Sequence, residues 1–242
     1  MKIRLDKLLV GKKLASSRQN AQAMIGAGRV FVNGTLADKA GSVFPAESSV
    51  EIKGENNPYV SRGGLKLTAG LKYFCINPKD FICADIGAST GGFTDCLLQH
   101  GASKVYAVDV GYGQLDWRLR NDHRVVVMER TNARYLKKGD IPESLDLAVI
   151  DAAFISLKLL IPPLLIFFSG RVSIIGLIKP QFEVGKGLVG KGGVVRDPEL
   201  HENVIAMIEN FAVSLGLISG GVTQSPVLGP KGNREFLIHL HS

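Results

Sequence analysis

The chain has 242 residues, a formal net charge of +7 and 45% hydrophobic side chains. The apolar fraction is sufficient for a packed core and excludes a disordered chain, and the length suits one full-size domain with a smaller one. No uninterrupted apolar run is long enough to span a bilayer, and the N-terminus lacks the apolar region of a signal peptide. Three cysteines without metal-type spacing lie in apolar surroundings, at Cys75, Cys83 and Cys96. We therefore expect reduced packing cysteines, no bound metal and a cytoplasmic protein.

The positive charge is concentrated near the N-terminus. The first 40 residues hold eight lysine and arginine side chains against only Asp6 and Asp38. Surplus charge on a short segment often serves solubility alone. A basic module attached to an apolar body more often indicates a nucleic-acid partner.

Two short helices and a hairpin are predicted within this basic segment. Apolar residues recur at helical spacing over 5–9 and again over 21–25, the second set after a start at 16–17. Asn33-Gly34 then follows an apolar run, which is a strong signal for a two-residue hairpin turn. The basic side chains expected on the solvent side of the helices are Arg4, Lys7 and Arg18.

The remaining chain is predicted to form a parallel sheet covered by helices on both faces. A polar, turn-rich stretch at 54–58 is the expected linker. Strands are expected near 82–85, 104–109, 125–128, 145–151, 172–178, 217–225 and 234–240, and helices near 65–74 and 198–215. The apolar stretch 157–168 is expected to form a buried helix preceded by, or kinked at, Pro162-Pro163. The last two strands, joined through a turn at 229–232, are expected to form an antiparallel hairpin.

The most informative stretch runs from Asp85 to Asp95, where an apolar strand must turn sharply into a helix. Its glycines permit a close approach of backbone to a ligand. The run lacks both the G-x-G-x-x-G pattern and the Gly-Lys-Ser/Thr ending of a phosphate-binding loop. The next predicted strand ends in Asp109, at the position that binds a ribose diol in nucleotide-type α/β sites. The alternative is an ordinary strand–turn–helix of an α/β protein.

An acidic residue followed by such a glycine-rich turn resembles the S-adenosylmethionine loop of class I methyltransferases. This resemblance implies S-adenosylmethionine as the cofactor. The residues that it implies as cofactor-binding are Asp85, Gly87, Ser89, Thr90, Gly91, Gly92, Phe93, Asp109, Val110 and Asn132. Asn132 would face the adenine edge where an aspartate is more usual, and a helix cap is its alternative role.

Four polar residues follow the linker or lie beside predicted strand ends, namely Lys66, Asp151, Lys179 and Glu235. Each alone would be a surface charge more often than a catalyst. Together they resemble the Lys-Asp-Lys-Glu tetrad of the FtsJ-type ribose 2′-O-methyltransferases. The resemblance implies that Lys179 is the base or the group that orients a hydroxyl. It also implies that Asp151 holds Lys179 in place and that Glu235 positions Lys66. A lysine is a base only in its neutral form, which burial or a neighbouring cation favours.

The N-terminal segment resembles the S4 RNA-binding domain over about the first 55 residues. The matching runs are Arg4–Leu9, Ser17-Arg18 and Gly28–Gly34. With Ser61–Leu67, Ile178–Glu183 and Gly232–Leu237, the whole chain resembles the TlyA family of rRNA methyltransferases, which are also called hemolysins. The RNA-binding residues proposed on this basis are Arg4, Lys7, Arg18, Lys39 and Arg62.

The expected architecture is a small α+β S4-like domain at 1–57, with the start of the linker, and a methyltransferase domain at 58–242. The second domain should be Rossmann-like, with a seven-stranded, mostly parallel sheet. The resemblance implies methylation of a cytidine 2′-hydroxyl in large-subunit rRNA, with small-subunit rRNA as a further target. The expected partners are rRNA or ribosomal subunits, with no membrane, and the expected state is a monomer or weak dimer.

The sequence departs from the family pattern after Asp151, where Ala152-Ala153 stands in place of a pair ending in serine. The glycine- and lysine-rich stretch 185–193 is a candidate lid over RNA or merely a flexible loop. Two other functions remain open. A non-catalytic ribosome-assembly protein is disfavoured by the intact tetrad, and a membrane-active hemolysin is disfavoured by the absence of a strongly amphipathic basic helix.

Overall fold

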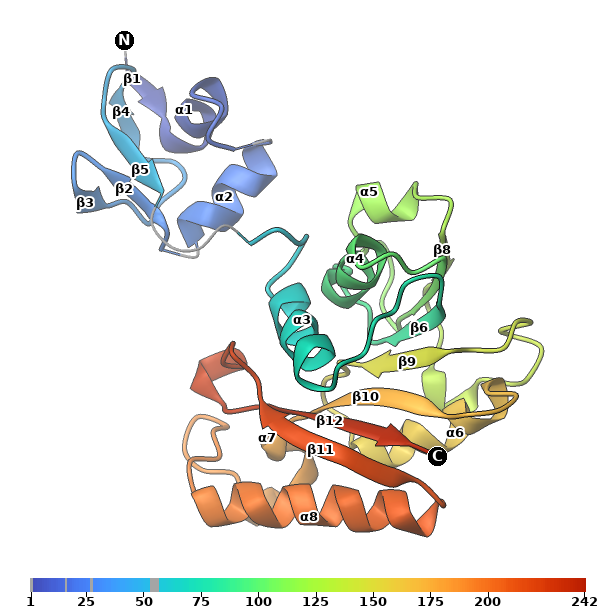
Figure 1. Cartoon of the computed structure of the whole chain (residues 1–242). Helices are drawn as coiled ribbons and strands as arrows, with labels where there is room; N and C mark the ends of the chain where they lie inside the picture. The colour runs from blue at the N-terminus through green and yellow to red at the C-terminus, as the bar shows by residue number, and fades with distance from the viewer. Residues whose placement is uncertain (1, 16, 27, 53–56) are drawn as a thin grey trace. The chain divides into compact units, whose positions relative to one another are not determined.

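The computed structural model describes residues 2–15, 17–26, 28–52 and 57–242 (Figure 1). The chain divides into two units, Met1–Asn56 and Asn57–Ser242, and each is described by itself. Most of the linker expected at 54–58 lies outside the described residues, and so does Ser16 of the predicted helix start.

The N-terminal unit is a small α+β fold. Its elements are β1 (Lys2–Arg4), α1 (Leu5–Gly11), α2 (Arg18–Gly26), β2 (Val30–Val32), β3 (Thr35–Leu36), β4 (Val43–Pro45) and β5 (Val50–Ile52). The predicted hairpin is confirmed: β2 pairs with β3 across Asn33 and Gly34, both of which have positive φ. β5 pairs with the other edge of β2, and β1 pairs with β4. The apolar faces of α1 and α2 pack on this framework through Leu5, Leu9 and Ile25.

The C-terminal unit contains the predicted seven-stranded sheet, in the order β11-β12-β10-β9-β6-β7-β8. Its strands are β6 (Ile82–Ile86), β7 (Lys104–Val108), β8 (Val125–Met128), β9 (Leu147–Ile150), β10 (Ser173–Ile178), β11 (Ile218–Gln224) and β12 (Phe236–His241). The pairings among β6 to β10 are parallel, whereas β12 is antiparallel to both β10 and β11. This confirms the predicted mostly parallel sheet and its final antiparallel hairpin.

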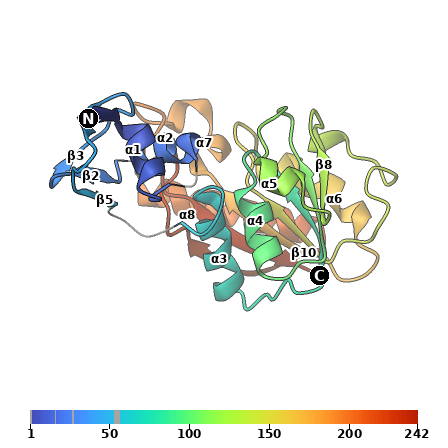
Figure 2. The ribbon, with the colours of Figure 1, turned by 90° about the horizontal axis from the view of Figure 1, so that it is seen from above.

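Helices cover both faces of this sheet, with α3 and α4 on one side and α8 on the other (Figures 1 and 2). The α-helices are α3 (Gly63–Tyr73), α4 (Gly92–Gln99), α5 (Trp117–Arg120), α6 (Ile161–Leu164), α7 (Pro180–Glu183) and α8 (Pro198–Ser214). Short 3₁₀ turns lie at Ala133–Tyr135, Leu157–Leu159, Leu165–Phe167, Lys186–Leu188 and Pro230–Gly232.

Two apolar cores result from the alternation of side chains along each strand. In β9, Leu147 and Val149 face the core that contains α3 and α4, whereas Ala148 and Ile150 face the core that contains α8. Because this strand is buried on both faces, it appears in the sequence as an uninterrupted apolar run. Polar residues directly after such a strand therefore mark its exit from the core.

Two sequence expectations were wrong. The stretch 157–168 is not one helix but two 3₁₀ turns flanking the four-residue α6, because Pro162 and Pro163 supply no N–H and stand at the start of a helix. Cys75 is exposed rather than packed, since it follows α3 with φ of 55° in the left-handed region. Cys83 and Cys96 are buried as expected.

Within the described ranges, the structure contains no helix that is both long and apolar enough to cross a membrane.

Candidate active site

Two adjoining cavities open where β6, β7 and β9 end. Their volumes are about 350 Å³ and about 400 Å³. Both are lined by Gly87, Ser89 and Asp151, so these residues lie on the wall between them. The carboxyl ends of parallel strands are where open α/β sheets bind ligands.

The glycine-rich turn between β6 and α4 is packed tightly against protein as well as facing the cavities. Gly87 has φ of +84°, and a Cβ atom there would lie 2.8 Å from the carbonyl oxygen of Asp151. Gly91 has φ of +95°, and a Cβ atom there would overlap Leu119. Residues with side chains fit neither position, so these glycines are required for the local fold in addition to any ligand approach.

Asp85 is fully buried at the end of β6 and lines the first cavity. Its Oδ2 accepts hydrogen bonds from the backbone N–H of Thr94 at 2.9 Å and the hydroxyl of Thr94 at 2.7 Å. Its Oδ1 is buried without a partner. Burial raises the pKa of Asp85 to about 7, while the Thr94 bonds oppose the rise. An unpartnered carboxylate oxygen at a cavity wall is suited to receive a cationic ligand group.

Asp109 follows β7 and is held by backbone. Its Oδ2 accepts from the N–H of Ser89 at 2.8 Å, and its Oδ1 accepts from the N–H of Gly111 at 2.6 Å. The neighbouring Val110 is 69% exposed and lines the second cavity beside Asp109. Asn132 lines the same cavity, and its Oδ1 also accepts from the N–H of Arg134 at 3.2 Å, so the helix-cap role is present.

The remaining predicted cofactor residues are also near this wall. Ser89, Thr90, Gly92 and Phe93 line the first cavity, whereas Gly91 does not and instead contacts the α5 side of the turn.

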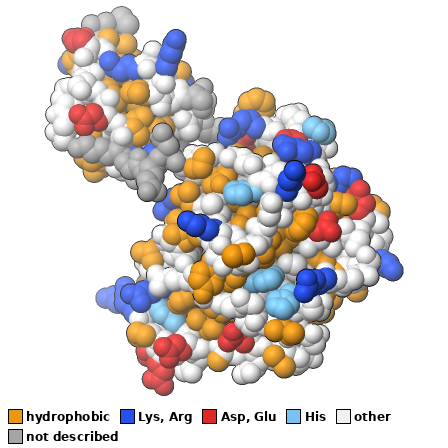
Figure 3. Space-filling view, viewed as in Figure 1, with side chains coloured by type: hydrophobic (Ala, Val, Ile, Leu, Met, Phe, Trp, Pro, Cys, Tyr) orange, Lys and Arg blue, Asp and Glu red, His pale blue; other side chains and the backbone are white. Residues whose placement is uncertain are grey.

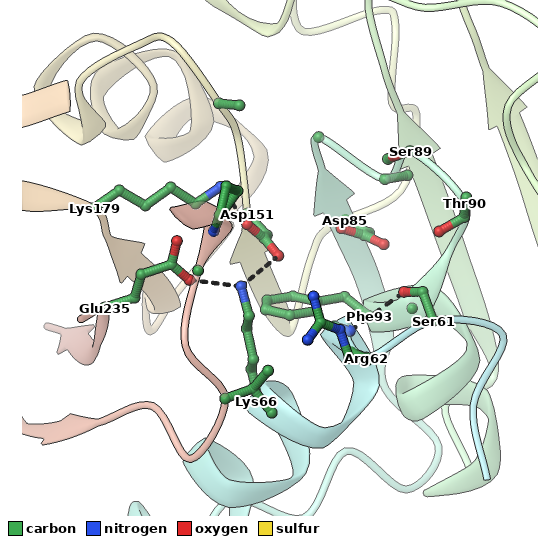
Figure 4. A pocket seen from close by; sticks show the side chains of 18 of the residues that line it. Ser61, Arg62, Lys66, Asp85, Ser89, Thr90, Phe93, Asp151, Lys179 and Glu235 are labelled. Atoms are coloured by element: carbon green, nitrogen blue, oxygen red, sulfur yellow. Dashed lines mark hydrogen bonds and ion pairs between the residues drawn. The ribbon is translucent and has the colours of Figure 1, made fainter. Parts of the chain in front are cut away.

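The four predicted tetrad residues form a continuous chain of alternating charges (Figure 4). Lys179 Nζ lies 2.6 Å from Asp151 Oδ1, Lys66 Nζ lies 3.9 Å from Asp151 Oδ2, and Lys66 Nζ lies 2.6 Å from Glu235 Oε2. The Glu235 side chain is completely buried, and the other three are 10–19% exposed. All four line the first cavity.

The topology explains why residues so distant in sequence meet. Asp151 and Lys179 follow the parallel strands β9 and β10, so they leave the sheet at the same edge. β12 runs antiparallel to β10 with Phe236 opposite Ile178, so the start of β12 brings Glu235 to that edge as well. Lys66 reaches the group from the first turns of α3, whose buried Leu67 fixes the helix on the sheet.

A half-buried carboxylate that the sequence interpretation missed, Glu183, joins the segments that follow β9 and β10. Glu183 Oε2 accepts from the hydroxyl of Ser156 at 2.5 Å, and its Oε1 accepts from the N–H of Leu157 at 2.8 Å. Burial raises the pKa of Glu183. Thr94, the partner of Asp85, was also missed. Both contacts depend on side-chain direction in three dimensions, which residue spacing does not encode.

Exposed aromatic side chains follow the strands β7, β8 and β9, and one of them, Phe154, lines the second cavity. Tyr112 is 69% exposed with the guanidinium of Arg130 4.2 Å from its ring centre. Phe154 is 88% exposed, has φ of 63° and lines the cavity. Trp117 and Tyr135 are exposed on the helical turns that follow β7 and β8. Exposed aromatic and arginine side chains together are suited to stacking on nucleobases.

The predicted RNA-binding side chains lie in both units. Arg62 is exposed and lines the first cavity next to Lys66. Lys7 and Lys39 are exposed in the N-terminal unit. Figure 3 shows basic side chains on the visible face of that unit beside acidic ones.

The fold and site define the class of protein. A mostly parallel seven-stranded sheet with an antiparallel final strand, a glycine-rich turn after β6 and a carboxylate after β7 are features of a class I methyltransferase. Comparisons with known proteins agree. Residues 59–242 match the FtsJ-like methyltransferase family, and residues 3–46 match the S4 domain.

Relatives match along nearly the entire chain. A candidate rRNA methyltransferase of Bacillus subtilis, YqxC, is 49% identical over 99% of this chain and 86% of its own. The 16S/23S rRNA (cytidine-2′-O)-methyltransferase TlyA of Mycobacterium tuberculosis is 48% identical over 99% of this chain and 90% of its own. A solved candidate hemolysin from Streptococcus thermophilus is 43% identical with a TM-score of 0.80, covering 100% of this chain and 88% of that one. The chain belongs to the FtsJ-like methyltransferase family and carries an S4 domain, and its cofactor is S-adenosylmethionine.

Proposed function

We propose that this chain methylates the ribose 2′-hydroxyl of a cytidine in ribosomal RNA, with large-subunit rRNA as the principal target and small-subunit rRNA as a second one. The observation that carries the proposal is the contact of Lys179 Nζ with Asp151 Oδ1 at 2.6 Å, within a buried chain of charges beside the glycine-rich turn. The relative from M. tuberculosis, whose name includes this reaction, supports the choice of nucleotide and of both subunits.

The residues that line the cavities fit the cofactor. The orphaned Oδ1 of Asp85 suits its ammonium group, Asp109 suits its ribose, and Val110 with Asn132 suits its adenine. We assign Gly87, Ser89, Thr90, Gly91, Gly92 and Phe93 to the turn that surrounds it. When bound, S-adenosylmethionine supplies a methyl group activated by a positive sulfonium.

The tetrad would act on the accepting hydroxyl. Lys179 orients the hydroxyl and accepts its proton as the oxygen attacks, and Asp151 fixes Lys179 and stabilises the ammonium group that results. Lys66 is the second cation beside Asp151, and Glu235 holds Lys66 in place. Alignment of oxygen and methyl carbon contributes a large share of the acceleration, since the reaction is an in-line displacement.

RNA recognition is assigned to both units. We place the RNA-binding domain at residues 1–57 and the catalytic domain at 58–242. Arg4, Lys7, Arg18 and Lys39 would contact phosphates from the first domain, and Arg62 would do so at the cavity mouth. Stacking on the exposed Tyr112 and Phe154 would hold unpaired bases beside the site. A ribosomal substrate places the enzyme in the cytoplasm, where we propose that it acts as a monomer or weak dimer.

Transfer of radiolabelled methyl from S-adenosylmethionine to free rRNA, 50S subunits and 30S subunits tests the proposal. Nuclease digestion followed by mass spectrometry of the nucleosides identifies the modified position. We expect 2′-O-methylcytidine from the large-subunit substrates. Label on a base atom would contradict the assigned chemistry. No label on any RNA, with cofactor binding intact, would instead favour a non-catalytic role in ribosome assembly.

A further inference from the structure

Five hydrogen-bond donors converge on one buried carboxylate in the N-terminal unit. Asp6 lies in the first turn of α1, and its side chain is completely buried. Arg4 approaches it as a fork, with Nε 3.1 Å from Oδ1 and Nη2 3.1 Å from Oδ2. Arg18 Nη2 donates to Oδ2 at 2.9 Å, and Gln22 Nε2 donates to the same oxygen at 3.2 Å. The backbone N–H of Lys7 donates to Oδ1 at 2.9 Å.

Both arginines remain accessible although they share this buried partner. The side chain of Arg4 is 46% exposed and that of Arg18 is 54% exposed. Each guanidinium has five N–H groups in a rigid plane. Asp6 engages two of them on Arg4 and one on Arg18, so each plane is fixed at one edge while its exposed part faces solvent.

Local stability alone does not account for two arginines at Asp6. A buried carboxylate needs a partner, and a single bidentate guanidinium with the Lys7 N–H already supplies one. The second arginine comes from a different element, the first residue of α2. The result is that two cations, one from β1 and one from α2, are held on the same carboxylate. Without Asp6 the two guanidinium groups would move apart, because like charges repel. Arg4 and Arg18 together hold the pKa of Asp6 well below its usual range, so the carboxylate stays ionised near neutral pH.

We propose that Asp6 is a positioning residue for RNA binding: it holds Arg4 and Arg18 as a preorganised pair that receives phosphate oxygens. The inference rests on the proposed RNA substrate. Asp6 itself does not touch RNA. It lowers the conformational entropy that two long side chains would otherwise lose on binding, which is a recognised route to higher affinity. Planar guanidiniums match phosphate geometry only when their orientation is set.

In Asp6→Asn, the direction in which RNA affinity changes distinguishes the positioning role from simple charge attraction. The change raises the net charge by one and keeps an oxygen that can accept from Lys7. If charge attraction alone determined affinity, the more positive variant would bind the RNA anion more tightly. Loss of the preorganised pair predicts binding of 23S rRNA weakened about tenfold, through disordered side chains. The salt dependence should also become shallower, by about 1 to 2 in the slope of log affinity against log salt, as phosphate contacts are lost.

The experiment measures 23S rRNA affinity for the full chain and its variants over a range of salt. Glu47→Gln is the matched control, because Glu47 is an exposed acid in the same unit and its replacement makes the same charge change. This control should bind equally well or slightly more tightly. The KM for S-adenosylmethionine and the kcat at saturating RNA should be unchanged in Asp6→Asn.

The same substitution made in a second parent protein keeps the test decisive if Asp6→Asn also destabilises the N-terminal unit. In a chain that already carries Arg4→Ala and Arg18→Ala, Asp6→Asn should no longer weaken binding, because Asp6 acts through the two arginines. Equal weakening in both backgrounds would assign Asp6 a purely structural role and overturn the inference. Unchanged or tighter binding in the wild-type background would overturn it as well. Failure of the wild-type chain to bind or methylate rRNA would instead defeat the proposed function, so the two failures are distinguishable.

Discussion

At the scale of single residues, the candidate site is a set of charges that stabilise one another. Lys66 and Lys179 are nearly buried, and both are tolerated there because each lies 2.6 Å from a carboxylate. Removal of one member leaves its partner buried without compensation, which costs about 3 to 5 kcal/mol for a fully buried pair. Tests of catalytic roles in this group therefore need a control that separates chemistry from stability.

Lys179→Ala should reduce methyl transfer by about 10²- to 10⁴-fold while binding of cofactor and RNA persists, since the proposed proton acceptor is removed. Steady-state kinetics with saturating rRNA measures this effect. Lys104→Ala is the matched control, because Lys104 also lies 2.6 Å from a carboxylate, that of Glu143, but at the start of β7. The control should retain full kcat. Equal turnover by Lys179→Ala and the wild type would remove Lys179 from the mechanism.

Asp85 makes the stability of the catalytic unit depend on pH. Its pKa rises from 3.8 to about 7 on folding, so the folded state retains a proton that the unfolded state releases. Stability should therefore fall as pH rises through this window, by up to about 1.4 kcal/mol per pH unit, and level off above it. Urea unfolding of the wild type and of Asp85→Asn, from pH 5 to 8, measures the effect as the difference between the two proteins. A difference that does not change with pH would show that Asp85 is ionised throughout.

Sequence reasoning located residues at strand ends but not their supporting contacts. Asp151 and Lys179 were predictable because each is the first charge after a buried apolar run. Glu183 was not, because its partners Ser156 and Leu157 lie more than 25 positions away on another loop. The sequence showed Asp6 only as one of two acids in the basic segment, and its contact with Arg18 results from the packing of α1 against α2.

At the scale of elements, the periodicity of apolar residues in the sequence predicted the position of the longer regular elements. The helix α8 lies within a residue of its expected range, since its 17 residues are a long run of one pattern, and the four-residue strand β8 lies at its expected range. The stretch 157–168 failed because hydrophobicity alone does not distinguish a buried helix from consecutive short turns. The antiparallel direction of β12 was predicted from its turn, and it is what brings Glu235 to the site.

The turn between β6 and α4 should not tolerate a side chain at its first glycine. In Gly87→Ala the new Cβ would meet backbone atoms of Asp151 and Ala152 at 2.8–2.9 Å in a positive-φ conformation. We expect a loss of roughly 2 kcal/mol in stability and weaker cofactor binding, since the ends of β6 and β9 must separate. Thermal unfolding and calorimetric titration of S-adenosylmethionine measure the two effects.

Gly139→Ala is the control for this change, because Gly139 lies in open space on a loop. It should leave both measurements as in the wild type. Normal cofactor affinity in Gly87→Ala would mean that the turn and the end of β9 adjust independently, contrary to the close packing between them.

At the scale of the whole molecule, the two units have separate cores. Both cavities, the tetrad and the two large apolar cores are formed by residues of Asn57–Ser242. The N-terminal unit has its own smaller core and carries Arg4, Lys7 and Arg18. This division predicts that substrate recruitment and methyl transfer can be separated experimentally.

A chain reduced to residues 57–242 should bind S-adenosylmethionine with unchanged affinity and show a KM for rRNA raised by about tenfold or more, because the phosphate contacts of the missing unit are lost. Its kcat at saturating RNA should approach that of the full chain, since the tetrad is intact. Adding residues 1–56 as a separate polypeptide should not lower the KM, because recruitment depends on the covalent connection and the effective concentration that it provides. If the shortened chain loses kcat even at saturating RNA while its cofactor affinity is preserved, the N-terminal unit must take part in forming the productive RNA complex and not only in recruiting the substrate.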